Sequence, residues 1–188
     1  MNVITISRQM GSRGDELARQ VADQLNWRCV GYELMNQAAV AAGAPHVALA
    51  EIDELGFFNL QPTAEERQAY QSEIERIIRE LAGEGHVVLL GRGGQVILHN
   101  HPHVLHVRVV APLETRVNWL QHEKNFPADE ARICLVQSDH VRTRYLRQHY
   151  NKDLDDPMLY HLMINTGLLD LPQTVKLITQ AVQDLREK

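Results

Sequence analysis

The chain has 188 residues, of which 44% are hydrophobic and 23% charged, the balance of an ordinary globular protein with one core. No stretch approaches the roughly 18 apolar residues that a membrane span needs, and the first residues lack the basic region and cleavage site of a signal peptide, so we expect a soluble cytoplasmic protein with no membrane partner. The net charge of −5 disfavours nucleic acid as a partner, because duplex binding usually leaves a basic balance.

Strands and helices alternate along the first part of the chain, the pattern of a mostly parallel sheet covered by helices. Residues 3–7 predict a strand, which a Gly- and Ser-containing turn joins to an amphipathic helix over residues 15–25. A short strand at 28–30 precedes a helix at 33–42. Residues 44–62 have a weaker pattern, which we interpret as an irregular or short-helix segment that forms a flap over a site.

The second part of the chain continues the alternation. Thr63 and Glu66 form a capping-box pattern at the start of a helix that runs to about residue 81. The remaining expected elements are strands at 86–90, 104–110 and 160–164, and helices at 113–124, at 127–150 as one long or broken helix, and from Pro172 onward. Because no linker of domain-dividing length interrupts them, we predict a single domain over residues 1–188.

The turn Ser7–Gly14 stands where phosphate-binding loops occur, between a first strand and a helix. Successive backbone N–H groups and a helix N-terminus bind phosphate there, and Gly11 and Gly14 permit the close approach. The standard string G-x-x-x-x-G-K-[ST] is absent, so Arg13 or Arg8 would have to supply the cation. Asp15 would repel phosphate. A plain strand-to-helix turn is the alternative interpretation.

The cysteines and histidines do not predict a metal centre. Cys29 and Cys134 lie far apart in apolar surroundings, which suits buried thiols in a reducing compartment better than a disulfide. Four histidines cluster in sequence, but no Cys or acidic partner with zinc spacing accompanies them, and we expect no metal site there. They are His99, His101, His103 and His106.

Several short motifs, in order, resemble the cytidylate kinase-like family, a divergent branch of the nucleoside monophosphate kinases. They are Ile4–Arg8 with Gly11–Ala18, Gly91-Arg92-Gly93, His106–Arg116, Asp139-x-x-Arg142, and Tyr160-x-Leu162-x-Ile164-Asn165-Thr166. The resemblance implies a three-layer α/β fold of the phosphate-binding-loop NTPases, with a five-stranded parallel sheet flanked by helices. It also implies an acceptor-side segment at about 32–82, a lid at about 126–150, ATP or another nucleoside triphosphate with Mg²⁺ as the donor, and CMP, dCMP or a related small acceptor.

The resemblance also implies roles for individual residues. Donor-binding residues would be Arg8, Gly11, Ser12, Gly14, Asn165 and Thr166. Catalytic arginines would be Arg13 in the loop and Arg142 and Arg147 in the lid, whereas Arg144 suits a solvated helix face. Acceptor-binding residues would be Glu33, Arg92 and Asp139. Asp139 would orient a lid arginine or cap a broken helix, and Arg116 is either a site residue or a structural ion-pair partner.

Three departures from the family pattern leave other functions open. After the second strand, where the family usually has an aspartate, this chain has Gly31 and Tyr32 followed by Glu33, which could replace it. His161 occupies the position of an acidic residue of the last strand, and Arg13 occupies that of a loop glycine. A regulatory module that binds nucleotides without turnover, and a kinase for a different small acceptor, are therefore alternatives to the nucleoside monophosphate kinase. An apolar helix face left uncovered by the sheet would support a homodimer.

Overall fold

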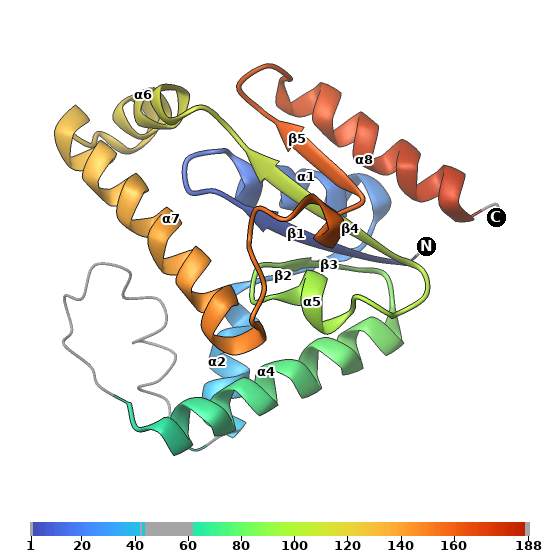
Figure 1. Ribbon diagram of the computed structural model, residues 1–188. Coiled ribbons are helices and arrows are strands. Elements are labelled where there is room, and N and C mark those ends of the chain that lie inside the picture. The colour runs from blue at the N-terminus through green and yellow to red at the C-terminus, as the bar shows by residue number, and fades with distance from the viewer. Residues whose placement is uncertain (1, 42, 44–61, 187–188) are drawn as a thin grey trace.

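The computed structural model describes residues 2–41, 43 and 62–186, and its centre is a parallel sheet of five strands (Figure 1). The strands are β1 (Val3–Arg8), β2 (Arg28–Val30), β3 (Val87–Leu90), β4 (Val104–Val110) and β5 (Leu162–Asn165). Their order in the sheet is β2-β3-β1-β4-β5, and every pairing is parallel. The predicted five-stranded parallel sheet is confirmed.

Helices cover both faces of the sheet. They are α1 (Gly14–Leu25), α2 (Tyr32–Ala41), α4 (Ala64–Glu84), α5 (Gly94–Ile97), α6 (Leu113–Lys124), α7 (Ala128–Tyr150) and α8 (Leu171–Arg186), with a short 3₁₀ helix η1 (Pro157–Leu159). One face packs against α1 and α8, and the opposite face packs against α2, α4 and α5. The helices α6 and α7 pack against each other and lie beside the carboxyl ends of the strands (Figure 1).

The central strands divide their side chains between two cores because successive residues of a strand point to opposite faces. Ile4 and Ile6 of β1 join the core under α1 and α8, whereas Val3 joins the core under α2, α4 and α5. Thr5 and Ser7 share the face of Val3. Parallel register sets Thr5 against His106 and Ser7 against Arg108, so two polar pairs lie within a largely apolar face.

His106 is a buried polar residue at the centre of the sheet. Its Nδ1 lies 2.7 Å from the hydroxyl of Thr5, and its backbone N–H donates to Nδ1 of His161 at 2.9 Å. The two imidazole rings stack with centroids 5.0 Å apart. Burial, followed by the proximity of His161 and His99, lowers the pKa of His106 to about 4. Burial also lowers the pKa of His161.

Because of the lowered pKa of His106, we predict that the stability of the folded protein depends on pH. An unfolded histidine takes up its proton near pH 6.5, whereas folded His106, with a pKa of about 4, does not, so the unfolded state binds more protons between these values. The contribution is therefore complete above pH 6.5 and declines as the pH falls toward 4. We expect the free energy of unfolding in urea to drop by about 2 kcal/mol from this residue between pH 7 and 5.

The control for that measurement is a pair of histidine variants. His106→Gln should lose less stability than the parent protein over the same pH interval, because its side chain does not titrate. His122→Gln, which changes an exposed histidine of α6, should keep the full pH dependence. An equal pH dependence in the parent protein and in His106→Gln would contradict the assignment.

The expected elements agree with the structure only in part. Of the two alternatives for residues 127–150, the single long helix is confirmed as the unbroken α7. The last strand was expected from residue 160, but it begins at Leu162 because Pro157–Leu159 forms a 3₁₀ turn ahead of it. The four-residue helix α5 was not predicted, since one turn is too short to show a helical period.

Other expectations are confirmed or lie outside the described residues. Thr63 accepts from the N–H of Glu66, and the Glu66 carboxylate accepts from the N–H of Thr63, which completes the capping box. Cys134 is buried as expected, whereas Cys29 is half-buried, and these two cysteines form no disulfide with each other. The proposed flap at 44–62 falls, apart from Pro62, outside the described residues. In the part of the chain that the structure describes, every helix is too short or too polar to cross a membrane.

Candidate functional site

Two glycine-containing loops meet at the carboxyl edge of the sheet. The first joins β1 to α1, and the second, Gly91–Gly93, joins β3 to α5. Because β1 and β3 are parallel neighbours, their loops lie side by side, and the N–H of Gly91 donates to the carbonyl of Ile6. Ligands of open α/β sheets bind outside the carboxyl ends of the strands, so this edge is the candidate site.

The β1–α1 loop is tightly closed. Gly11 and Arg13 both have positive φ angles, 76° and 61°, and Arg13 is the residue that precedes α1. The hydroxyl and the N–H of Ser12 both donate to the carbonyl of Gln9, at 2.8 and 3.3 Å. A Cβ atom at Gly14 would lie only 2.5 Å from Cβ of Arg8. The loop thus brings the N-terminus of α1 directly against the end of β1, and N–H groups at a helix N-terminus are favourable to anions.

Arg8 connects the two loops. Its Nε and Nη2 donate to one carboxylate oxygen of Asp15, at 3.0 and 2.8 Å. On its other side, Nη1 lies where a Cβ on Gly91 would approach it to 2.7 Å. Asp15, expected to repel phosphate, is therefore balanced by a cation at the same position. Arg13, by contrast, is exposed and pairs with Glu16.

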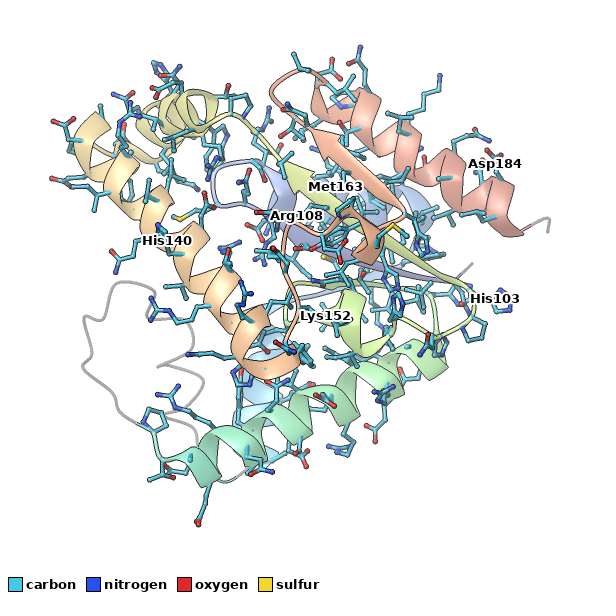
Figure 2. All side chains as sticks on the ribbon, in the orientation of Figure 1. His103, Arg108, His140, Lys152, Met163 and Asp184 are labelled. Atoms are coloured by element: carbon cyan, nitrogen blue, oxygen red, sulfur yellow. The ribbon has the colours of Figure 1, made fainter. Side chains whose placement is uncertain are left out.

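The helix α7 brings Arg142, one of the three arginines in its second half, to the loop. Nη1 of Arg142 donates to the backbone carbonyl of Arg8 at 2.8 Å. Arg144 and Arg147 are exposed, and Figure 2 shows His140 on the outer side of the same helix. The structure thus brings Arg142 to the candidate site and leaves Arg147 in solvent; the phosphate-binding roles expected of both stay predictions.

Arg92 follows β3 and also contacts α7. Its guanidinium carbon lies 5.6 Å from the ring centroid of Tyr145, a cation–π distance, and Tyr145 donates its hydroxyl proton to Gln71 at 3.0 Å. Tyr145 is one helical turn beyond Arg142. Arg142 and Tyr145 of α7 thus contact residues of β1 and of the β3–α5 loop, respectively. Arginine guanidinium groups can donate to phosphate in bidentate fashion.

Arg116 and Asp139 form an ion pair between α6 and α7. The two guanidinium nitrogens Nη1 and Nη2 lie 3.2 and 2.9 Å from the two oxygens of Asp139. Arg116 also donates from Nε to the carbonyl of Ala111 and from Nη1 to that of Met10. Arg116 is therefore an ion-pair partner, and Asp139 sits within unbroken helix rather than capping a broken one. Acceptor binding by Asp139 stays a prediction.

The last strand contributes a contact to the same loop. The hydroxyl of Thr166 lies 2.8 Å from the carbonyl of Ser12 and 3.2 Å from that of Val110, so it joins the loop to β4. Oδ1 of Asn165 accepts from the N–H of Gly167 at 2.9 Å. Glu33 lies in the first turn of α2, but its side chain is outside the described part of the chain. The ligand roles of these three residues stay predictions.

The sequence did not single out the buried residue Arg108, which lies in the interior in Figure 2. Its Nη1 donates to the hydroxyl of Ser7 at 2.9 Å and its Nη2 to Asp155 at 3.0 Å. Tyr160 lies beside this group and donates to the carbonyl of Leu154, and burial raises the pKa of Tyr160. An arginine at an inward position of a largely apolar strand was the available signal.

Metal ligands do not gather in the described residues. Within residues 2–41, 43 and 62–186, no group of three or more His, Cys, Asp and Glu side chains could hold a metal ion. A magnesium ion that accompanies a triphosphate needs no such group, because it is bound by phosphate oxygens, water and one or two carboxylates. The half-buried carboxylate of Asp15, at the start of α1, fits that requirement.

The comparisons of sequence agree with one another. A model of the Cytidylate kinase-like family matches residues 3–168. The cytidylate kinase of Methanocaldococcus jannaschii is 27% identical over 190 residues, which cover 98% of this chain and 99% of the relative. The cytidylate kinase of Methanopyrus kandleri is 27% identical over 194 residues, which cover 99% of this chain and 95% of the relative.

Solved structures share the fold at low identity. An uncharacterized protein from Eubacterium ventriosum has a TM-score of 0.78 at 18% identity, with 97% of this chain and 99% of the other covered. A gluconokinase from Sinorhizobium meliloti has a TM-score of 0.59 at 12% identity, with 99% and 94% covered. Shikimate kinase from Acinetobacter baumannii has a TM-score of 0.57 at 16% identity, with 100% and 96% covered. The chain therefore has the three-layer α/β fold of the phosphate-binding-loop kinases.

Proposed function

The chain belongs to the cytidylate kinase-like family, and from this premise we propose that it transfers the γ-phosphoryl group of ATP to a nucleoside monophosphate, with CMP or dCMP as the preferred acceptor. The observation that supports the proposal is that α7 contacts both loops at the carboxyl edge of the sheet: Arg142 donates to the carbonyl of Arg8, and Tyr145, one turn later, packs against Arg92. Phosphoryl transfer requires little of the protein beyond positioning and neutralisation of charge, which these groups can supply.

The donor would bind at the β1–α1 loop. Backbone N–H groups of Gly11, Arg13 and Gly14 at the N-terminus of α1 would hold its phosphates, whereas the N–H of Ser12 donates to Gln9. Arg8 would supply the positive charge that a loop lysine provides in the standard motif, because it already lies beside the loop and its partner Asp15 is half-exposed. When Mg²⁺ is bound with the triphosphate, Asp15 would contribute a carboxylate to it, and the ion would neutralise charge on the transferred group.

The acceptor would bind between the β3–α5 loop and α7. Arg92 presents a planar guanidinium that can grip a monophosphate through two N–H groups, and Tyr145 supports that guanidinium from α7. Arg142 would neutralise charge on the phosphoryl group as it passes between the two nucleotides. The mechanism needs no covalent intermediate on the protein.

A coupled assay with ATP and Mg²⁺ tests this proposal, with CMP, dCMP, UMP, AMP and GMP as separate acceptors. We expect turnover with CMP or dCMP and a kcat/KM at least tenfold lower for the purine monophosphates. Calorimetric titration of each nucleotide runs beside it. Tight ATP binding without turnover of any acceptor would favour the regulatory module or another small acceptor, and absence of ATP binding would overturn the phosphate-loop assignment.

A further inference from the structure

The helix α7 reaches the β1–α1 loop at two successive places. Arg142 donates to the carbonyl of Arg8 directly. One turn earlier, Asp139 holds Arg116, which donates to the carbonyl of Met10. The backbone at the start of the loop is therefore connected to α7 through one direct contact and one that passes through α6.

Arg116 is built into the base of the loop. Only 4% of the residue is exposed, and its Nε, Nη1 and Nη2 all have acceptors. The backbone of Gly11, with its φ of 76°, rests on Arg116 so closely that a Cβ on this glycine would lie 3.0 Å from Cβ of Arg116. A displacement of Arg116 would therefore also displace the backbone of Gly11, because closely packed groups move together.

A second pair joins the same two helices without touching the loop. Arg132 of α7 donates to both oxygens of Glu114 of α6, at 2.6 and 2.7 Å. Both side chains are exposed, 45% and 67%, and exposed ion pairs contribute little to stability. Both ion pairs join α6 to α7, but only Arg116–Asp139 also contacts the loop. The pair Arg132–Glu114 is therefore a control for the effect of joining the two helices alone.

We propose that Arg116 and Asp139 are a positioning pair that fixes the phosphate-binding loop relative to α7. Asp139 then acts on the donor through Arg116 rather than on the acceptor by contact. The inference rests on the proposed function, because it treats the β1–α1 loop as the donor site. It predicts that loosening the pair weakens ATP binding while the acceptor KM stays within about twofold of its value in the parent protein.

The test compares Asp139→Asn with Glu114→Gln. The asparagine keeps the size of the side chain but removes the countercharge of a buried guanidinium, which loosens the loop. We expect Asp139→Asn to weaken ATP binding about tenfold in calorimetry and to speed amide hydrogen exchange of residues 9–14 about tenfold, the effect of losing one charged hydrogen bond. Glu114→Gln should change neither value by more than about twofold.

Two results would overturn the inference. Unchanged ATP affinity and loop exchange in Asp139→Asn would show that the pair does not position the loop, and a raised acceptor KM alone would make Asp139 an acceptor ligand. Because Arg116→Lys risks misfolding at a buried site, it is used only for hydrogen exchange, where it should match Asp139→Asn. Exchange is measured without turnover, so failure of the kinase assay with the parent protein would leave this test intact.

Discussion

Replacing Gly14 with alanine is expected to weaken ATP binding on the order of 100-fold, about 2.7 kcal/mol. The new Cβ would lie 2.5 Å from Cβ and 2.8 Å from Cγ of Arg8, distances that non-bonded carbon atoms do not tolerate. Arg8 cannot yield easily, since its guanidinium is held between Asp15 and Gly91. The backbone of the loop must therefore move apart from Arg8, and its N–H groups no longer point together toward the phosphates. Calorimetric titration with ATP and Mg²⁺ measures the loss.

Gly83→Ala provides the matched control for this substitution. Gly83 lies in the last turn of α4, has no atom within 4 Å of an added Cβ, and does not have a positive φ. Alanine there should leave ATP binding unchanged and raise stability by about 0.5–1 kcal/mol, because glycine is unfavourable in a helix. If Gly14→Ala, shown to be folded by thermal denaturation, binds ATP as the parent protein does, the β1–α1 loop is not the donor site.

Replacing Arg92 with alanine is expected to raise the KM for the monophosphate acceptor by about 10-fold to 100-fold, the range expected for losing a charged, bidentate contact to phosphate. The KM for ATP should stay within about twofold, because Arg92 packs on Tyr145 of α7 and belongs to the β3–α5 loop, not to the β1–α1 loop. A φ of 56° is equally unfavourable for alanine and for arginine, so the substitution adds no backbone strain. Steady-state kinetics with each nucleotide varied in turn separates the two KM values.

Arg76→Ala is the control for Arg92→Ala. Arg76 lies exposed on α4 and pairs with Glu73 and Glu80 of the same helix, so its loss removes one positive charge from the protein without altering the carboxyl edge of the sheet. Arg92→Lys, which keeps the charge but not the planar fork, should give a KM between those of the parent protein and Arg92→Ala. An acceptor KM that Arg92→Ala leaves unchanged would remove this residue from the acceptor site.

Much of the fold could be predicted because local pattern and tertiary environment agree. Apolar runs such as that of β3, together with Gly and Pro residues at the ends of helices, indicated where the strands lie. The predicted bounds of every strand fall within two residues of the observed ones. The one-turn helix α5 and the turn Pro157–Leu159 escaped prediction, because helices of three or four residues are too short to show a helical period.

The candidate site was predictable in its residue types but not in its pairings. The sequence predicts a solvated helix face for Arg144 and a role in the site for both Arg142 and Arg147, whereas the packing of α7 beside β1 brings only Arg142 to the loop. The partnership of Arg116 with Asp139 joins two helices, and that of Arg8 with Asp15 depends on the turn between them. Such contacts follow from tertiary structure, which no periodicity in the sequence encodes.

The central place of β1 in the sheet has a consequence for the way the chain folds during synthesis. β1 is made first, yet both of its neighbours, β3 and β4, come much later in the chain. Until Val104–Val110 have left the ribosome, the apolar strand Val3–Arg8 has at most one edge paired, and contacts so distant in sequence form slowly. A nascent chain that ends before β4 therefore exposes an unpaired, aggregation-prone strand edge. Chaperones would protect the chain from aggregation most during that interval of translation.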